Sequence, residues 1–353
     1  MKRTSHAAVV TVVAAVLSLG GAFPGEASGQ APADAGGWVH PTTPWGDPDL
    51  QGVWTSDSAR GIPFQRPEEL GDRAELTDEE FAAKIAGDDQ ARNAALNASG
   101  SFRNDSAWNT KTFRQTSLVV EPANGRIPAL TPEAQERRSP AGTFGDGPFD
   151  GPEDFSMYDR CISLGVPGSI TPKIYGNGSR IVQGPGYVAI SYEMIHETRI
   201  VRLDGGPHLG EDIRLYTGDS RGRWEGHTLV VETTNLTDKL NAPGSRVRSS
   251  TQMRLVERFT RTEADVLLYE VAFDDPGTFT APWKMVLPLA SPAGYMVLPY
   301  ECHEGNRAIM QALGGERAED RAVEEDRKRG IIRPRRPIQG GLTVGGQPLN
   351  NNE

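Results

Sequence analysis

Residues 300–307 read YECHEGNR and bring together side chains that take part in catalysis and metal binding. They place a cysteine, a histidine and two carboxylates together in a chain that has only two cysteines and six histidines. Imidazole titrates near neutral pH, and a neighbouring carboxylate can orient it or act as an acid. If this stretch is a strand, alternation puts Glu301 and His303 on one face and Cys302 on the other. The sequence therefore predicts Glu301 and His303 as a proton-transfer pair.

A second group of candidates is the carboxylate in the middle of nearly every predicted strand. A charge buried without a partner costs several kcal/mol, so these groups either face solvent or line a polar interior that holds a ligand. Both interpretations stay open from the sequence. The carboxylates are Glu193, Glu232, Glu257, Glu270 and Glu301, and the nearby cations are Arg199, Arg254, Arg258 and Lys284.

Three histidines are further candidates for acid–base chemistry or metal binding. His196 follows Glu193 in EMIHE, His208 lies in a GGPHL turn, and His303 follows Cys302. A lone histidine is usually structural, but imidazole is also a frequent general base and metal ligand. A divalent metal held by these three histidines is an alternative that the sequence does not favour. We predict no metal site and no cofactor.

The predicted site combines these groups. Its catalytic candidates are His196, His303, Glu193 and Glu301. Its substrate-binding candidates are Tyr192, Arg199, His208, Glu232, Glu257 and Arg258.

The first 29 residues have the pattern of a bacterial signal peptide. Lys2 and Arg3 form a positive start, residues 7–19 are small and apolar, and Ala27 lies in a small-residue stretch suited to cleavage. The apolar run is shorter than the roughly 20 residues that span a bilayer. We expect a periplasmic or secreted protein whose mature form has no membrane span.

Export changes the interpretation of the two cysteines. An isolated pair in an oxidising compartment usually forms a disulfide, so we predict a bond between Cys161 and Cys302. Free thiols are the alternative. Structural zinc is disfavoured because neither cysteine has a closely spaced Cys or His partner.

Charge and missing motifs argue against nucleic-acid binding and against several common enzyme classes. A net charge of −10 does not suit a protein that binds nucleic acid, which depends on clustered Lys and Arg. The chain has no dinucleotide-binding, Walker, HExxH or GxSxG motif, so several common enzyme classes lose their main support.

The elements that must position these residues are mainly strands. After a Pro-, Gly- and Trp-rich stretch, residues 30–172, with one helix at about 76–96, residues 173–305 form short alternating runs separated by turn signals. Successive strands of this kind predict an antiparallel up-and-down barrel or a strongly curved sheet. We expect an extended N-terminal wrap around this β domain, a C-terminal helix over residues 306–329 and a disordered tail over residues 330–353.

The predicted strands and turns are set by alternation and by Gly- and Pro-containing turn signals. Residues 204–207 and 218–222 are predicted turns. The predicted strands cover residues 187–203, 212–216, 227–236, 252–261, 266–273, 282–289 and 295–302.

Several motifs resemble those of a large family of uncharacterised exported bacterial proteins. They are TPWGDPDLQGVW, EMIHE, GDSRGRWEG and CHEGN, and they span most of the chain after residue 43. The resemblance implies a shared fold and no particular activity. In that family the position of His227 is more often acidic, which weakens any case for a ligand there. By analogy, the barrel is similar to those of calycins and lipocalins, which does not establish function.

Two functions remain open from the sequence. The first is an exported enzyme of hydrolase, lyase or isomerase type, which applies acid–base chemistry to a small organic or glycosidic substrate in the barrel. The second is a periplasmic protein that binds a small molecule without converting it. The many mid-strand charges favour the enzyme slightly.

Overall fold

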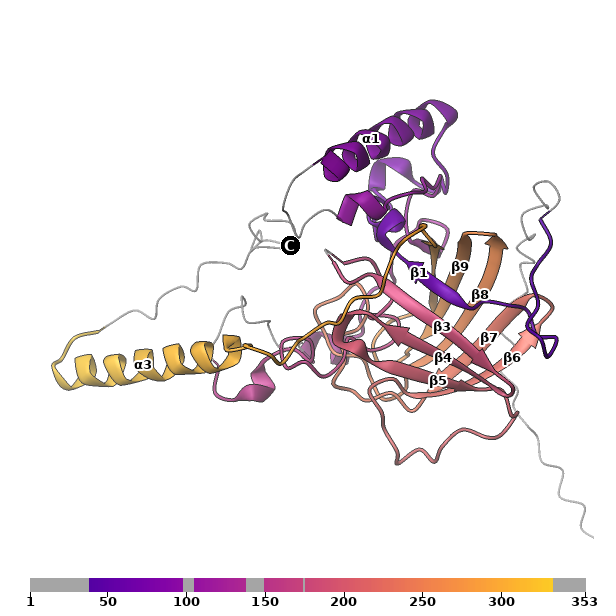
Figure 1. Ribbon diagram of the computed structural model, residues 1–353. Helices are drawn as coiled ribbons and strands as arrows, with labels where there is room; N and C mark the ends of the chain where they lie inside the picture. The colour runs from indigo at the N-terminus through magenta and orange to yellow at the C-terminus, as the bar shows by residue number, and fades with distance from the viewer. Residues whose placement is uncertain (1–37, 98–104, 138–148, 174, 333–353) are drawn as a thin grey trace, which may run out of the picture. The chain divides into compact units, whose positions relative to one another are not determined.

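Strands of the β domain curve into a closed barrel in the computed structural model, which describes residues 38–97, 105–137, 149–173 and 175–332 (Figure 1). The barrel strands are β1 (Gly52–Thr55), β3 (Gly178–Gly184), β4 (Tyr187–Tyr192), β5 (Thr198–Arg202), β6 (Asp219–Glu225), β7 (Thr228–Thr234), β8 (Arg254–Glu263), β9 (Val266–Asp274) and β10 (Trp283–Ala290). Their order is β1-β3-β4-β5-β6-β7-β8-β9-β10, and β1 pairs with β10 to close the ring. The predicted barrel is therefore confirmed, with closure removing the sheet edges.

The barrel departs from a simple up-and-down meander at one place. Strands β5 and β6 run parallel, whereas the other neighbouring pairs are antiparallel. Nine strands are an odd number, so strict alternation cannot close the ring and one pair must be parallel. The long connection over residues 203–218 makes this parallel return, because a tight hairpin can join only antiparallel strands.

Two junctions in the ring are short. Strands β5 and β6 share only the pairs Val201↔Ser220 and Arg202↔Arg221, and β1 meets β10 only at Thr55↔Ala290. In contrast, β8 and β9 are in register along almost their whole length. The barrel thus consists of two well-paired sheets, β1-β3-β4-β5 and β6 to β10, joined along two narrow seams.

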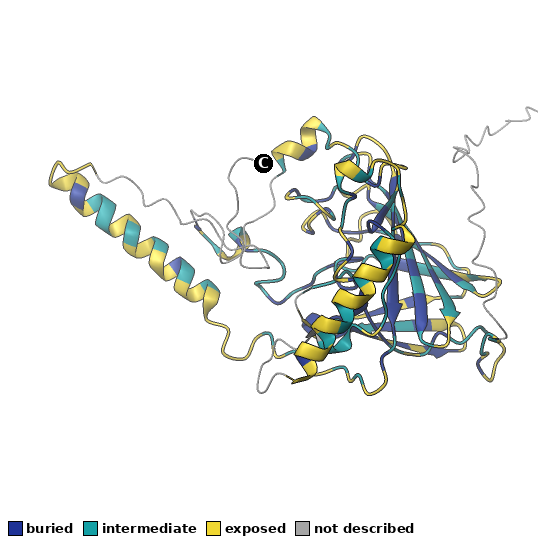
Figure 2. Ribbon diagram, turned by 90° about the horizontal axis from the view of Figure 1, so that it is seen from above, coloured by how far each residue is buried: buried dark blue, intermediate teal, exposed yellow. Residues whose placement is uncertain are grey.

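Side chains fill the barrel interior because alternate residues of each strand point inward. In β9 the buried residues Leu267, Tyr269, Val271 and Phe273 alternate with partly exposed ones. Trp283 of β10 stacks on Phe273 with ring centroids 3.9 Å apart. Figure 2 shows the buried residues along the strands. The interior is a packed core.

The N-terminal wrap contributes more regular structure than predicted. Its tryptophan-rich start supplies β1, whose Trp54 is buried in the core, and β2 (Val119–Glu121) lies outside the ring against β10. The short helical turns of the wrap are η1 (Asp57–Ala59), η2 (Glu68–Leu70), η3 (Asp105–Trp108) and η4 (Pro152–Asp154). The turn η5 (Met194–His196) lies between β4 and β5.

Three helices complete the fold. Helix α1 (Asp78–Asn97) matches the predicted helix and begins with a reciprocal cap, in which Thr77 Oγ1 accepts from the Glu80 amide and Glu80 accepts from the Thr77 amide. Helix α2 (Pro132–Glu136) is short, and α3 (Ala308–Lys328) confirms the predicted C-terminal helix. In the described ranges, no helix is long and apolar enough to cross a membrane. The predicted signal peptide and residues 333–353 of the predicted tail lie outside the described residues.

Several predicted strand boundaries were wrong. The run 187–203 is two strands separated by η5, so Glu193 and His196 are not in mid-strand. Residues 219–225, within and beyond a predicted turn, form β6, and β3 was missed. Residues 212–216 make only an isolated bridge at Leu215, and residues 295–302 are irregular. In the last stretch Met296 and Leu298 are exposed on one face and Pro299 and Glu301 on the other, so neither face is buried.

Candidate functional site

A pocket of about 310 Å³ lies beside the disulfide and is the strongest candidate for a functional site. The Cys161–Cys302 bond, predicted from the sequence, joins a turn at residues 156–162 to the segment that leads into α3. The pocket forms between these two pieces of chain. Its lining residues are Tyr158, Asp159, Tyr300, Glu301, Cys302, Asn306 and Ala308.

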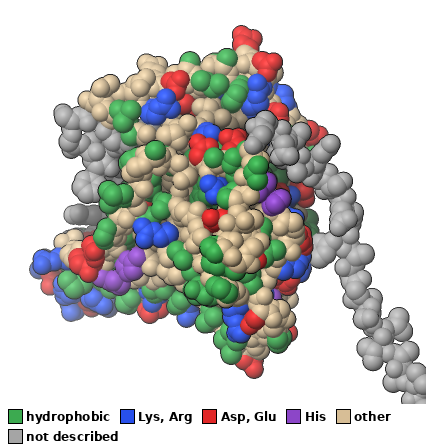
Figure 3. Space-filling model, turned by 45° about the vertical axis from the view of Figure 1, so that its right-hand side comes forward, with side chains coloured by type: hydrophobic (Ala, Val, Ile, Leu, Met, Phe, Trp, Pro, Cys, Tyr) green, Lys and Arg blue, Asp and Glu red, His purple; other side chains and the backbone are tan. Residues whose placement is uncertain are grey.

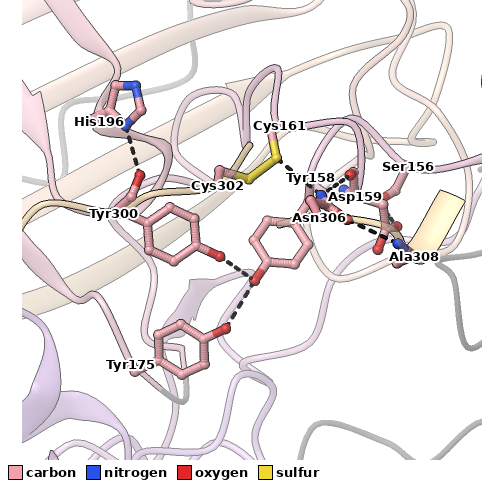
Figure 4. The surroundings of a disulfide bond; sticks show 10 residues. All are labelled: Ser156, Tyr158, Asp159, Cys161, Tyr175, His196, Tyr300, Cys302, Asn306 and Ala308. Carbon is pink, nitrogen blue, oxygen red and sulfur yellow. Dashed lines mark hydrogen bonds between the residues drawn. A yellow bond between two sulfur atoms is a disulfide. The ribbon is translucent and has the colours of Figure 1, made fainter. Parts of the chain in front are cut away.

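Three tyrosine hydroxyls meet at this site (Figure 4). Tyr158 Oη lies 2.9 Å from Tyr300 Oη and 3.3 Å from Tyr175 Oη. The rings of Tyr175 and Tyr300 are stacked with centroids 6.2 Å apart. Burial and the two neighbouring hydroxyls raise the pKa of Tyr158 well above its ordinary value. The Tyr158 hydroxyl therefore stays protonated at neutral pH and acts as a neutral hydrogen-bonding group.

Asn306 holds the two sides of the pocket together. Its Nδ2 donates to the Asp159 carbonyl at 3.3 Å and lies 3.5 Å from Cys161 Sγ, while its Oδ1 accepts from the Ala308 amide at 3.2 Å. The hydroxyl of Ser156 donates to the Asp159 carboxylate, and the Asp159 amide donates to Ser156 Oγ. The Asn306 side chain thus connects the two walls of the pocket, whereas Glu301 is exposed at its edge.

The four predicted catalytic residues do not share one centre. His196 Nδ1 lies 3.0 Å from the Tyr300 carbonyl, on the opposite side of the Tyr300 backbone from the ring that lines the pocket (Figure 4). His303 is exposed in the turn before α3 and does not line the pocket. Only Glu301 of the four lines it.

The fourth residue, Glu193, is a buried anchor between chain segments. Its carboxylate accepts from the Gly178 amide at 2.9 Å, the Tyr295 hydroxyl at 2.7 Å and the Leu298 amide at 3.0 Å. Gly178 packs closely against this carboxylate. A Cβ atom at this position would come within 2.6 Å of Glu193 Oε2 and 2.8 Å of the Tyr295 ring. Three donors satisfy this carboxylate, so it ties residues 295–298 to the start of β3.

Arg199 and Glu257 form an ion pair inside the barrel. Arg199 Nη1 and Nη2 donate to the two Glu257 oxygens at 2.5 and 3.0 Å, and both side chains are at most 2 % exposed. Tyr269 Oη donates to Glu257 Oε1 at 2.9 Å, and Thr233 Oγ1 donates to Oε2 at 3.2 Å. Arg199 belongs to β5 and Glu257 to β8, so the pair links the two sheets of the barrel.

Burial and the neighbouring carboxylate act on the pKa of Arg199 in opposite directions. Burial alone would lower the pKa of Arg199, but the Glu257 carboxylate raises it above its ordinary value. Burial raises the pKa of Tyr192, which lies on the same inner surface, to about 12. Arg199 and Glu257 are thus bonded to each other, and Tyr192 is surrounded by core residues. The barrel interior is therefore a packed apolar core that contains the Arg199–Glu257 ion pair, and Glu257 does not line a ligand cavity there.

His208 and Glu232 meet in a third cluster with the unpredicted Asp219. His208 Nδ1 is 2.8 Å from Asp219 Oδ2, and its Nε2 is 3.8 Å from Glu232 Oε1. Arg254 donates to both Glu232 oxygens at 2.9 Å. This hydrogen bond lowers the pKa of Glu232, while burial opposes but does not cancel the lowering of the Asp219 pKa by His208 and Arg221. The cluster fastens the β5–β6 connection to strands β6 and β7.

The remaining predicted residue, Arg258, pairs with Glu225 at 2.9 Å and is partly exposed. Figure 3 shows acidic and basic side chains mixed on one face of the molecule. In the part of the chain that the structure describes, no group of three His, Cys, Asp or Glu side chains could hold a metal ion.

Comparison with known proteins adds no relative to this description. No family model matches the chain, and neither the curated proteins nor the solved structures contain a match. The assignment of a site therefore rests on the residues themselves.

Sequence reasoning missed Tyr158, Asp159, Tyr175 and Asn306. Asn306 belongs to the CHEGN motif, but the motif does not indicate its partners, and these residues become neighbours only through tertiary structure. One signal was available, because the predicted disulfide necessarily brings residues beside Cys161 close to those beside Cys302. That constraint would have placed Tyr158 near Tyr300.

Proposed function

We propose that this protein is exported and binds a small polar organic molecule in the pocket beside the disulfide, without converting it. The observation that carries this proposal is the lining of the pocket. Tyrosine hydroxyls and carboxylates border it, and a covalent cross-link holds its two walls. Ligand sites commonly combine aromatic surface with a few polar groups on a rigid frame.

Two further observations support binding at this place rather than inside the barrel. The barrel interior is filled by the hydrophobic core, and its two charges are paired with each other. The predicted acid–base residues are dispersed, with Glu193 satisfied by three donors. A general base must lie within hydrogen-bond reach of its substrate proton, together with the groups that assist it.

Export is supported by the sequence of residues 1–29 and by the disulfide. Disulfides persist in oxidising compartments such as the bacterial periplasm and are rare in the reducing cytosol. The Cys161–Cys302 bond is therefore consistent with a periplasmic or secreted protein.

The acid–base enzyme is a second candidate, and one observation favours it. A backbone carbonyl can only accept a hydrogen bond, so Tyr300 fixes the proton of a neutral His196 on Nδ1. The basic nitrogen is then Nε2. A histidine oriented in this way is suited to accept a proton from a substrate bound nearby.

Binding and turnover can be separated with one set of proteins. The mature chain is mixed with a panel of saccharides, lactones, amines and aromatic metabolites, and binding is followed by ligand-observed NMR while products are followed by chromatography. We expect saturable binding without product, weakened at least fivefold by Tyr300→Ala. Tyr187→Ala, which removes an exposed tyrosine from β4, is the matched control and should leave binding unchanged.

Two results would contradict the proposal. Binding that Tyr300→Ala leaves intact would place the ligand elsewhere. Product formation that is lost in His196→Ala but kept in His303→Ala would favour the enzyme, with His196 as its base.

A further inference from the structure

We infer that the chain segment at the end of helix α3 docks on an anionic phospholipid bilayer. This segment, the basic terminus, covers residues 327–336 and has the sequence RKRGIIRPRR. It lies outside the lining of the pocket, so the inference concerns a second surface and does not depend on the proposed ligand.

Positive charge is concentrated in the basic terminus of a protein whose net charge is −10. Six of its ten residues are Lys or Arg, and no Asp or Glu occurs between Asp326 and Glu353. Glu324 offsets part of this charge, because it pairs with Arg327 at 2.9 Å and lies 3.7 Å from Lys328. No acidic residue lies among the arginines that follow, which are Arg329 and, beyond the described residues, Arg333, Arg335 and Arg336. The segment therefore keeps a local excess of positive charge that attracts an anionic surface.

The end of α3 also leaves two isoleucines in solvent. Around Gly330, whose φ is 75°, the Gly330 amide donates to the Arg327 carbonyl at 3.1 Å and the Ile331 amide donates to the Asp326 carbonyl at 2.9 Å. These are the two bonds of a Schellman cap, in which the residue after the glycine often packs on an apolar residue of the last turn. In α3 the corresponding positions are both acidic. Ile331 is accordingly 52 % exposed, and Ile332 is 95 % exposed.

The combination of charge and exposed apolar side chains favours a bilayer over a nucleic acid. A nucleic-acid backbone could bind the arginines through its phosphates, but it offers no apolar phase to Ile331 and Ile332. An anionic bilayer offers both, because guanidinium groups bind lipid phosphates while apolar side chains enter the boundary between headgroups and acyl chains. The basic terminus therefore has the two components that peripheral membrane binding requires.

The test measures binding of the mature protein to vesicles by sedimentation at pH 7 and low ionic strength. One kind of vesicle contains phosphatidylglycerol and phosphatidylcholine in equal parts, and the other contains phosphatidylcholine alone. We expect the partition coefficient to be at least tenfold higher for the anionic vesicles. Added salt should lower it because the attraction is electrostatic.

Matched variants test the apolar contribution. Ile331→Ser/Ile332→Ser keeps every charge of the basic terminus and should lower the partition coefficient for anionic vesicles at least fivefold. Met310→Ser makes a similar change at another exposed apolar residue of α3 and should alter it less than twofold.

A second pair of variants tests the charge. Arg329→Gln/Arg333→Gln should lower the partition coefficient at least fivefold, because both charges lie beside the isoleucines. Arg317→Gln/Arg321→Gln removes the same charge from exposed positions earlier in α3 and should alter it less than twofold.

Three results would overturn the inference. Absent binding, or equal binding to the two kinds of vesicle, would exclude anionic lipid as the partner. Binding that the substitutions at 329, 331, 332 and 333 leave intact would place the contact elsewhere on the protein. Duplex DNA that is bound as tightly as the anionic vesicles, and without any effect of Ile331→Ser/Ile332→Ser, would make the segment a general site for polyanions.

Discussion

The protein keeps charged residues in two very different settings. Inside the barrel, Arg199 and Glu257 are almost completely excluded from water and satisfy each other with two hydrogen bonds. In the pocket beside the disulfide, Glu301 is exposed at the edge, and Asp159 lies nearby with its carboxylate accepting from the Ser156 hydroxyl. The interior charges satisfy each other away from solvent, whereas the exposed carboxylate of Glu301 is accessible to a ligand.

The difference shows why a mid-strand charge is a poor guide to function by itself. A buried charge must find a partner during folding, because solvent cannot compensate it. The interior pair does so across the two sheets of the barrel, and its role is structural. Groups at the surface are under no such demand and can keep part of their bonding capacity for a ligand.

The comparison predicts its largest effect at Glu257. Replacing it with leucine leaves the Arg199 guanidinium buried without a counterion, and we expect a loss of about 3–5 kcal/mol in the free energy of unfolding. Urea denaturation followed by circular dichroism measures this loss. The double variant Arg199→Met/Glu257→Leu should recover most of it, because neither charge then remains.

The exposed partner of Arg258 provides the control for that experiment. Glu225→Gln removes the surface ion pairs with Arg258 and Arg223 and should cost less than about 1 kcal/mol. A Glu257→Leu protein as stable as Glu225→Gln would show that the interior pair does not hold the barrel together.

The disulfide predicts a somewhat smaller effect, and it acts on the pocket as well. Replacing both cysteines with alanine removes a cross-link between residues 141 positions apart. Restricting such a long loop lowers the entropy of the unfolded chain, so we expect a loss of about 2–5 kcal/mol in unfolding free energy. Binding at the pocket should weaken together with stability. Titration of the denatured wild-type protein that found two free thiols would refute the bond itself.

The smallest predicted effect concerns the cluster around His208. The folded-state pKa values of Asp219 and Glu232 lie below their ordinary values, so their contribution is complete above the unfolded carboxyl pKa of about 4 and disappears as the pH falls through the folded pKa values. Asp219→Asn should therefore cost up to about 1 kcal/mol at pH 7 and progressively less below pH 4. Denaturation midpoints measured from pH 3 to pH 7 test this, with Glu304→Gln as control. A cost that does not change with pH would contradict the role of the Asp219 charge.

The sequence predicted the barrel because its local signals were repeated. Alternation in residues 254–263 and 266–274 marks two long strands, and the predicted helices correspond to α1 and α3. The failures have physical causes. GDSRG contains strong turn residues, but in β6 the Gly222 backbone packs so closely on Leu203 and Val201 that a Cβ would lie 2.7 Å from each.

The site was harder to predict because it depends on distance in space. Glu193 and His196 have the right chemistry, but tertiary contacts decide that one is an internal anchor and the other lies beside a carbonyl group. The pairing of Arg199 with Glu257 joins residues 58 positions apart on strands that are not neighbours in the ring. The sequence can supply both charges, but it cannot indicate that they cancel.

The narrow parallel seam between β5 and β6 has a consequence for how the barrel moves. With only two residue pairs at this junction, the backbone there has fewer cross-strand hydrogen bonds to break than at β8 and β9. Local opening draws on such weakly connected regions. Amide protons along β5 and β6 should then exchange with solvent well before those of β8 and β9. Arg199 lies on β5 and binds Glu257 inside the ring, so this ion pair opposes the separation of β5 from β6.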